Sequence, residues 1–285
     1  MDTELARTFL AVVAAGNFSL ASSRLYITQS TVSARIATLE DQLGCRLFVR
    51  NKAGTRLTAA GHRFQSYATT LVRTVERARQ DIGIVRGFRA SLTIGGRFGL
   101  WEDLLLQSLP RIRSRIGEVA VRAEIGFEDD LMQGLMEART DLAVMYAPQR
   151  RPGIVIEPLL EERLVYVSAV RDEGELPGEG YVYVDWGPDF ARDHNAAFPA
   201  FVGPAMSVNV GWLGIRHIVA YGGSGYFPLR MVRDELVSGR LHRRPDAPEF
   251  VLPGFLVHLA DMDPETAGVA AEVIREVAAE AVRGA

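Results

Sequence analysis

One short stretch near the start of the chain constrains its fold more than any other part of the sequence. Between Thr28 and Gly44, apolar residues recur at spacings of 4, 3 and 4. They are Val32, Ile36, Leu39 and Leu43. This period places them on one face of a helix, which Thr28 can cap and Gly44 can end. The stretch therefore predicts an amphipathic helix with one buried face.

Two further helical patterns precede this one. The first has apolar residues at spacings of 4, 3 and 1, namely Leu5, Phe9, Val12 and Val13. Gly16-Asn17 breaks it, and Ser19 is a natural cap for a second helix that runs through Leu25. Only Tyr26-Ile27 then separates this helix from the next cap. Helices joined by so short a turn are typical of a helix-turn-helix.

The exposed side of the helix after Thr28 predicts DNA binding. Near its start it carries small and hydrogen-bonding residues with hardly any acid: Gln29, Ser30, Thr31, Ser33, Ala34 and Arg35. The major groove of DNA admits such a helix, and Gln, Ser and Arg can bond base edges and phosphates. The alternative is a polar face in contact with solvent, which would usually carry Glu and Lys. The predicted DNA contacts on this helix are Thr28, Gln29, Ser30, Thr31, Ser33 and Arg35.

A hairpin pattern follows this helix. Residues 47–50 and 55–58 are predicted strands, and residues 51–54 form a turn that contains glycine. Arg50, Lys52 and Arg56 lie on or near the tip of this hairpin. A wing of this kind places cations beside the phosphate backbone, which supplies affinity rather than sequence choice. Residues 1–58 are therefore predicted to form an N-terminal winged helix-turn-helix that is otherwise all-α.

The distribution of charge is consistent with this assignment. The formal net charge is −3, but residues 1–90 hold 13 Lys+Arg against 6 Asp+Glu, and residues 91–285 hold 19 against 29. Such a split indicates two parts with different partners, one of them a polyanion. Chance clustering of charges on solvated faces is the alternative, so charge alone does not establish DNA binding.

A long helical pattern follows the hairpin, from a cap at Thr58 to about Gly87. Its apolar residues keep a heptad-like spacing: Phe64, Leu71, Val75, Ala78, Ile82 and Val85. A single helix cannot bury such an apolar stripe (the seam) by itself and needs a partner. Residues 59–88 are therefore predicted to form a linker and dimerisation helix. Packing of the seam on its own domain is the alternative.

Residues 1–88 resemble the DNA-binding region of the LysR-type transcriptional regulators of bacteria. The match rests on Phe9, the stretch Leu25-Tyr26-Ile27-Thr28-Gln29-Ser30-Thr31-Val32-Ser33, Ile36, Leu39-Glu40, Leu43-Gly44, Leu47-Phe48, Arg50, and Leu57-Thr58-Ala59-Ala60-Gly61. The resemblance implies contacts to double-stranded operator DNA from Gln29, Ser30, Ser33, Arg50 and the wing. Ala34 departs from the family, which often has arginine there. The resemblance also implies a homodimer or homotetramer, and contact with RNA polymerase if the protein is an activator.

From Ser91 onward, strands alternate with helices, which predicts an α/β domain with a parallel sheet over residues 91–285. The predicted strands are 92–94, 119–125, 142–146, 163–169, 181–184, 207–210 and 255–259; the predicted helices include 101–116, 131–138 and 265–282. The sensor region of the family resembles periplasmic solute-binding proteins, with two α/β subdomains linked by crossing strands. On this resemblance, residues 91–160 with 253–285 form subdomain one, and residues 161–252 form subdomain two.

The loops after the strands are the candidate effector site, because ligands of such sheets bind at the carboxyl ends of strands. The predicted effector contacts are Arg97, Phe98, Tyr146, Trp186, Asn209, Gly211 and Ser224. Arg97 follows the first strand, and arginine can bind a carboxylate in a bidentate manner. We therefore predict a small anionic or carboxylate-bearing effector; an exposed or ion-paired Arg97 is the alternative. Residues 186–190, Trp-Gly-Pro-Asp-Phe, are similar to a branch of the family that includes an enterobacterial regulator of flagellar genes.

Signatures of enzymes do not occur in the sequence. The five histidines form no His-x-x-x-His or Glu-x-x-His pair, and there is no Gly-x-Ser-x-Gly elbow or phosphate loop. Cys45 is the one cysteine, which excludes a disulfide framework and a Cys-cluster zinc site. We expect no catalytic residues, no metal and no cofactor. No apolar run has the length of a membrane span, and the N-terminus does not resemble a secretory signal, so a cytoplasmic location is expected.

Together, these patterns predict a transcriptional regulator that binds promoter DNA and responds to a small molecule in the interdomain cleft. A second interpretation keeps the DNA binding but assigns only oligomerisation to the C-terminal part, without a ligand. A third is a small-molecule-binding enzyme.

Overall fold

A computed structural model of the chain describes residues 2–51, 54–82, 88–171 and 174–283. Contacts between Cα atoms divide the chain into two compact units. One unit comprises residues 1–84 and 136–139, and the other comprises residues 85–135 and 140–285.

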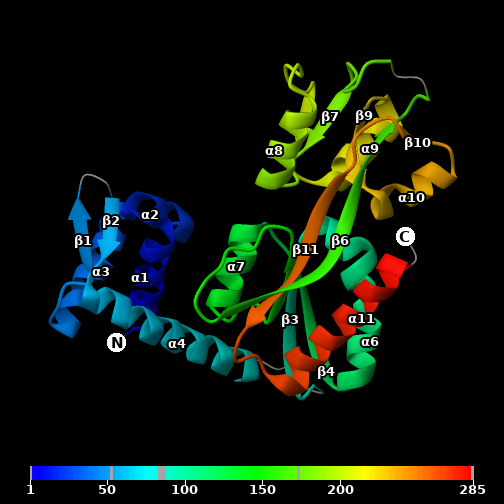
Figure 1. Cartoon of the computed structure of the whole chain (residues 1–285). Helices are drawn as coiled ribbons and strands as arrows, with labels where there is room; N and C mark the ends of the chain where they lie inside the picture. Colours follow the sequence, from blue (N-terminus) through cyan, green and yellow to red (C-terminus); the bar gives the residue numbers. More distant parts are fainter. Residues whose placement is uncertain (1, 52–53, 83–87, 172–173, 284–285) are drawn as a thin grey trace. The chain divides into compact units, whose positions relative to one another are not determined.

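The N-terminal unit has the predicted helix-turn-helix followed by a hairpin (Figure 1). Its elements in chain order are α1 (Thr3–Ala15), α2 (Phe18–Leu25), α3 (Gln29–Leu43), β1 (Phe48–Asn51), β2 (Gly54–Leu57) and α4 (Ala59–Ile82). Strands β1 and β2 pair antiparallel, as the sequence predicts for the wing.

Capping bonds set the ends of these helices. The Asn17 side chain accepts a hydrogen bond from the backbone N–H of Leu20 at 2.7 Å, and α2 begins directly after Asn17. The prediction that Ser19 caps this helix was wrong, because Asn17 already satisfies one of the first amides. Thr28 caps α3 and Gly44 ends it in the left-handed conformation, both as predicted.

An aromatic cluster forms the centre of the N-terminal core. The ring centroid of Phe9 lies 5.1 Å from that of Phe48 and 5.0 Å from that of Phe64, which it meets edge-on. Helix α3 adds Val32, Ile36 and Leu39, all buried. Leu43, which the same period places on the buried face, is 39% exposed, because it lies in the last turn of the helix beyond this core.

Helix α4 begins against the wing. The backbone N–H of Thr58 donates to the carbonyl of Leu47 at 2.9 Å, and the Thr58 hydroxyl accepts from the N–H of Gly61 at 3.0 Å. A Cβ at position 61 would lie 2.2 Å from the Leu47 carbonyl oxygen. Glycine is therefore required here so that the first turn of α4 can touch the backbone before β1.

The first half of α4 packs on its own domain, against α1. Phe64, Ala68 and Val72 are buried in the N-terminal core, and Leu71 packs against it. The prediction that Phe64 belongs to a dimer seam was therefore wrong, because its side chain is buried within the chain. Leu71 is half-buried, and its place in the seam stays a prediction.

The second half of α4 differs from the first. Ala78 is exposed, and Ile82 is 86% exposed. Val75 is half-buried, and Val85 lies outside the described residues. This half of α4 therefore leaves two described apolar side chains, Ala78 and Ile82, exposed.

The C-terminal unit is built on a mixed sheet (Figure 1). Its strands are β3 (Ala90–Gly96), β4 (Val119–Ile125), β5 (Leu142–Met145), β6 (Ile154–Ser168), β7 (Tyr181–Val184), β8 (Met206–Val208), β9 (Ser224–Pro228), β10 (His242–Arg243) and β11 (Phe250–Leu259). Their order across the sheet is β4-β3-β5-β11-β6-β9-β7-β8, with β10 also paired to β6. Strand β3 is parallel to β4 and β5, and β7 is parallel to β8 and β9. Each parallel group forms the centre of one subdomain.

Helices cover both faces of this sheet. They are α5 (Phe98–Leu100), the π-helical turn η1 (Trp101–Leu105), α6 (Leu106–Ile116), α7 (Glu128–Met136), α8 (Pro188–Ala197), α9 (Gly211–Tyr221), α10 (Leu229–Val237), the π-helical turn η2 (Pro264–Gly268) and α11 (Val269–Arg283). Leu131 and Leu135 of α7 pack against Ala143 and Met145, while Val144 faces the core that α11 shares. Side chains alternate along β5, so α7 and α11 lie on opposite faces.

Strands β6 and β11 connect the two subdomains (Figure 1). They pair antiparallel from Ile154↔Leu259 to Leu164↔Phe250, with a register shift at Gly254/Phe255. Strand β5 pairs with one half of β11, and β9 pairs with the far half of β6. The predicted architecture of two α/β subdomains joined by crossing strands is confirmed. The sequence patterns had predicted only residues 163–169 and 255–259 of these strands.

Candidate functional site

The start of α3 presents polar groups to solvent. Thr28, Gln29 and Ser30 are exposed, and Thr31 and Ser33 are half-buried. The Thr28 hydroxyl accepts from the backbone N–H of Thr31 at 3.2 Å and lies 2.8 Å from the Ser30 hydroxyl, which fixes the first turn. The predicted base-contacting residues thus share the N-terminal end of one helix, where the helix dipole also favours an anion.

Arg35 is half-buried and is paired with the neighbouring helix. Its guanidinium donates to the Glu4 carboxylate at 3.2 Å and to the Thr8 hydroxyl at 3.3 Å, both on α1. The prediction that Arg35 contacts DNA stays a prediction, but it would require this pairing to be given up. The helical period turns this side chain toward the neighbouring helix, and its charge is paired within the domain.

The wing carries the next predicted contacts. Arg56 is exposed on β2, opposite Val49 of β1, and the N–H of Thr55 donates to the Gly16 carbonyl at 3.1 Å. Arg50 lies on β1, and Lys52 lies outside the described residues. The backbone of the wing is thus held to the end of α1.

Glu40 anchors the wing from α3, a role that the sequence analysis missed. Its buried carboxylate accepts from the backbone N–H groups of Leu47 at 2.8 Å and Phe48 at 3.2 Å, and from Arg46 at 2.6 Å. Burial alone would raise the pKa of this carboxyl, but the three hydrogen bonds outweigh burial and hold the pKa below its ordinary value. An acid in the last turns of an otherwise acid-poor helix is the signal that could have indicated this anchor.

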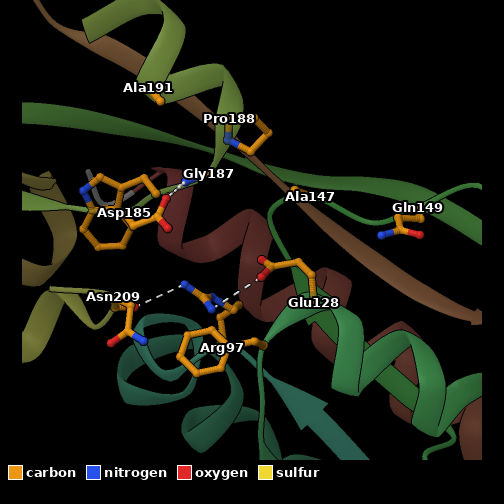
Figure 2. A pocket seen from close by; sticks show the side chains of 11 residues that line it. Arg97, Glu128, Ala147, Gln149, Asp185, Gly187, Pro188, Ala191 and Asn209 are labelled. Atoms are coloured by element: carbon orange, nitrogen blue, oxygen red, sulfur yellow. Dashed lines mark hydrogen bonds and ion pairs between the residues drawn. The ribbon is translucent and has the colours of Figure 1, made fainter. Parts of the chain in front are cut away.

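A cavity of about 690 Å³ lies in the C-terminal unit, between the two parallel strand groups (Figure 2). It is lined by Arg97, Phe127, Glu128, Ala147, Gln149, Asp185, Trp186, Gly187, Pro188, Ala191 and Asn209. These residues follow the carboxyl ends of β3, β4, β5, β7 and β8. This is the position at which sheets of this kind bind ligands.

Arg97 lines this cavity and is only 8% exposed. Its guanidinium is 3.4 Å from the Glu128 carboxylate, 3.4 Å from the Asn209 carbonyl oxygen and 4.5 Å from the centre of the Phe127 ring. Figure 2 shows the side chain between Glu128 and Asn209, directed into the cavity. The predicted position of Arg97 in the cleft agrees with this geometry, and it is ion-paired there.

Trp186 and Asn209 also line the cavity, from the second subdomain. The Trp186 indole N–H donates to the Tyr226 carbonyl at 2.9 Å, which fixes the ring. Gly211 supports it from behind, since a Cβ there would lie 2.4 Å from the indole. Gly211 therefore shapes the cavity without lining it.

Two other predicted contacts lie outside the lining. Phe98 packs on Trp212, with 6.0 Å between ring centroids. Tyr146 is buried, and its hydroxyl donates to Glu162 at 3.2 Å. Burial, and then the charge of Glu162, raise the pKa of this hydroxyl, so it remains a donor. The prediction that Tyr146 contacts the effector directly is corrected, because its side chain is buried and its hydroxyl is used in this hydrogen bond. Phe98 is half-buried, and its contact with the effector stays a prediction.

The same carboxylate holds Arg230 of α10. Glu162 accepts from Arg230 at 2.6 Å, and the guanidinium also donates to Asp103 at 2.9 Å and to the Gly99 carbonyl at 2.8 Å. Arg230 and Glu162 are both nearly buried, with side chains 12% and 4% exposed. This network joins the second subdomain to the π-helical turn of the first.

Ser224 was predicted to face the cleft, and this was wrong. It is fully buried and accepts a hydrogen bond from the Tyr166 hydroxyl at 2.7 Å. Strand β9 is parallel to β7, with Ser224 paired to Tyr181. Ser224 therefore begins its strand, at the edge of the sheet opposite the loop at Trp186.

Glu128 and Phe127 line the cavity but were not predicted. They follow β4, at the start of α7. The rule that indicated Arg97 applies equally to the loop after β4, so the acidic run that begins at Glu128 was the signal available. The other lining residues that were not among the predicted effector contacts are Ala147, Gln149, Asp185, Gly187, Pro188 and Ala191.

Comparison with known proteins agrees with both units. Residues 3–62 match the family model "Bacterial regulatory helix-turn-helix protein, lysR family". Residues 85–279 match the model "LysR substrate binding domain". The chain belongs to the LysR family of bacterial transcriptional regulators. This LysR-family regulator thus has a helix-turn-helix DNA-binding domain and a C-terminal substrate-binding domain.

Relatives of this regulator carry the same assignment. The HTH-type transcriptional regulator HdfR of Yersinia pestis is 31% identical over 274 residues, 92% of each chain. Among solved structures, ArgP from Mycobacterium tuberculosis has a TM-score of 0.59 at 23% identity, covering 98% of this chain and 97% of its own. LysG from Corynebacterium glutamicum, with bound effector Arg, has a TM-score of 0.59 at 20% identity, covering 98% and 99%. The two structures support the fold.

Among the residues that the structure describes, no helix has both the length and the apolar character needed to cross a membrane.

Proposed function

We propose that this LysR-family regulator selects its operator through the exposed start of α3 and responds to a small carboxylate-bearing molecule in the cavity at Arg97. The observation that carries the proposal is the position of Arg97, a nearly buried cation directed into a cavity at the carboxyl ends of parallel strands. LysG, a protein of similar fold, has been solved with its effector Arg bound.

The DNA part of the proposal rests on the surface at the start of α3. Gln29 and Ser30 are exposed, and Ser33 lies one turn further along the helix. In a helix-turn-helix, residues at this end of the second helix reach base edges in the major groove. Arg56 on the wing, with Arg50 and Lys52, would contact the phosphate backbone and carry affinity without sequence choice.

Replacing Gln29 or Ser33 by alanine is expected to reduce the preference for operator over random DNA. Loss of a base contact should cost about 1–3 kcal/mol of discrimination. Arg56→Ala should instead weaken binding to both DNAs alike and make the dependence of the binding constant on salt less steep. Fluorescence anisotropy of the full chain with both DNAs, at several salt concentrations, measures both effects.

The matched control for these variants is Thr38→Ala. Thr38 is exposed on α3 but lies nearer the other end of the helix, where its hydroxyl donates to the Ala34 carbonyl. It should leave the discrimination unchanged. If Arg56→Ala lowers discrimination as much as Gln29→Ala does, the division of roles between α3 and the wing is wrong.

The ligand part of the proposal rests on Arg97 and on the helix starts around it. Helices α7 and α8 both begin at the cavity, at Glu128 and Pro188. Their amides and the guanidinium favour a carboxylate. A molecule held between the walls would favour one angle between the subdomains over another. DNA binding would then respond through the oligomer.

Arg97→Ala is expected to abolish the ligand response and leave operator binding nearly unchanged. A hydrogen bond to a charged group contributes about 1.5–3 kcal/mol, so ligand affinity should fall at least about tenfold. A screen of carboxylic acids, amino acids and inorganic anions by thermal shift of the full chain identifies stabilising ligands. The same ligands are then tested for their effect on operator binding.

Arg113→Ala is the matched control, because Arg113 is exposed on α6, away from the cavity. An unchanged response in Arg97→Ala would remove Arg97 from the site. If no molecule stabilises the chain or changes operator binding, the second interpretation holds, in which the C-terminal domain only oligomerises.

The remaining assignments follow from these proposals. The proposed site binds its ligand without converting it, so the chain is a regulator rather than an enzyme. Members of this family form oligomers, and the surface around the exposed Ala78 and Ile82 of α4 is the one we propose for the dimer contact. Because it would act on promoter DNA, we propose that the protein is cytoplasmic. If it activates transcription, it would also contact RNA polymerase.

A further inference from the structure

The cavity at Arg97 contains charges of both signs. Among the described residues that line it, Arg97 is the only cation, while Glu128 and Asp185 are acidic. Figure 2 shows Glu128 and Asp185 on different sides of the Arg97 guanidinium. The cavity therefore does not have the excess of positive charge expected of a site for a simple anion.

The ion pair between Arg97 and Glu128 is long. Its atoms are 3.4 Å apart, whereas charge-assisted N–H···O bonds prefer about 2.7–2.9 Å. The contact from Arg97 to the Asn209 carbonyl is also 3.4 Å. In the same domain, Arg230 and Glu162 approach to 2.6 Å. Both charged groups at the cavity therefore have hydrogen-bonding capacity that a ligand can use.

A ligand with a single charge fits these partners poorly. A plain carboxylate on Arg97 would displace Glu128, whose side chain is only 23% exposed, and leave its charge without a cation. Leaving a charged group unpaired in a partly buried site is costly. An amine alone would bond to Glu128 but be repelled by Arg97.

A molecule with both charges satisfies both partners. Its carboxylate can take the place of Glu128 on Arg97, and its ammonium can take the place of Arg97 on Glu128. The charge of the site is then unchanged on binding. The two partners are 3.4 Å apart, so the two groups of the ligand must be close together, as they are on the Cα of an amino acid.

We propose that the ligand of this cavity is a free α-amino acid, with its carboxylate on Arg97 and its ammonium on Glu128. This inference rests on the proposed function of the cavity as the ligand site. Pro188, Ala191 and the Trp186 ring offer apolar surface for the side chain, and the volume of about 690 Å³ leaves room for it.

The test compares three probes that share a side chain and differ in which charged groups they carry. Each proteinogenic L-amino acid is screened by thermal shift on the full chain. For one that stabilises the protein, titration calorimetry then measures the amino acid, the acid that lacks its amino group and the amine that lacks its carboxylate. We expect the amino acid to bind at least about tenfold more tightly than either analogue.

Glu128→Gln identifies the partner of the ammonium. It should weaken binding of the amino acid about tenfold or more, and leave binding of the deaminated acid equal or tighter. Glu179→Gln is the matched control at an exposed glutamate away from the cavity, and should change neither. The melting temperature without ligand and the affinity for operator DNA show whether Glu128→Gln is folded.

Each other outcome overturns the inference. Deaminated acids that bind as tightly as amino acids, with no effect of Glu128→Gln, would show that the site recognises only a carboxylate. In that case the proposed function stands, provided that Arg97→Ala abolishes the binding. If none of the three classes of probe stabilises the chain or changes operator binding, the ligand site and the amino-acid inference both fail.

Discussion

Replacing Arg230 by methionine is expected to lower the free energy of unfolding of the C-terminal unit by about 3–5 kcal/mol. The loss arises because the variant leaves the Glu162 carboxylate, only 4% exposed, without the guanidinium that neutralises it. Burial alone would lower the pKa of Arg230, but the charge of Glu162 outweighs it and raises this pKa, so the arginine remains charged. Urea denaturation of the full chain, followed by tryptophan fluorescence, measures the loss.

Arg233→Met is the control for this variant, since Arg233 is exposed on the same helix. It should lower the free energy of unfolding much less than Arg230→Met does. The double variant Arg230→Met/Glu162→Gln should recover part of the loss, because it removes the buried charge together with its partner. A loss below about 1 kcal/mol for Arg230→Met would show that water or another group satisfies Glu162.

Gly61→Ala is expected to destabilise the N-terminal unit by about 3 kcal/mol, against the usual preference of helices. In an open helix, alanine is favoured over glycine by about 1 kcal/mol. Here the added Cβ would lie 2.2 Å from the Leu47 carbonyl oxygen and 2.8 Å from a methyl group of Leu57. The first turn of α4 must therefore move away from the wing.

Whether Gly61→Ala lowers or raises stability is the decisive observation. Thermal denaturation of the full chain measures it, together with the affinity for operator DNA. Ala59→Gly, at an exposed position in the same turn, gives the propensity difference without a contact. A Gly61→Ala variant that is more stable than the natural chain would show that α4 does not press on the backbone at Leu47.

Local signals made the N-terminal unit predictable. Thr28 and Gly44 act on the backbone within a few residues, so they fix the ends of α3 whatever the rest of the chain does. What these local signals could not show there has non-local causes. Arg35 is polar and falls near the predicted DNA face, and only the position of Glu4 on α1 shows that its charge is already paired.

The crossing strands were half missed for a different reason. Residues 157–162 of β6 contain charged residues and a proline, and the first half of β11 contains Pro253 followed directly by Gly254. These parts lack the period of two that identifies a strand with one buried face. Their partners are each other, about a hundred residues apart in sequence, so no local window contains the information.

Part of the ligand cavity could be predicted from the ends of strands, and part could not. Arg97, Trp186 and Asn209 follow strands that the sequence revealed, and all line the cavity. Ser224 was misplaced because β9 was not predicted; without that strand, its glycine-rich surroundings resembled a loop at the cleft. Whether a residue precedes or follows a strand decides which edge of the sheet it reaches.

The pairing of β6 with β11 has a consequence for how the second subdomain is attached. The chain leaves along β6 and returns along β11, with Glu162 and Leu252 as register partners. The outgoing and returning segments are thus about 5 Å apart, the ordinary spacing of paired strands. In topological terms, the second subdomain is an insertion whose two ends lie side by side. It could be gained, lost or exchanged as a block without a change in the path of the chain through the first subdomain.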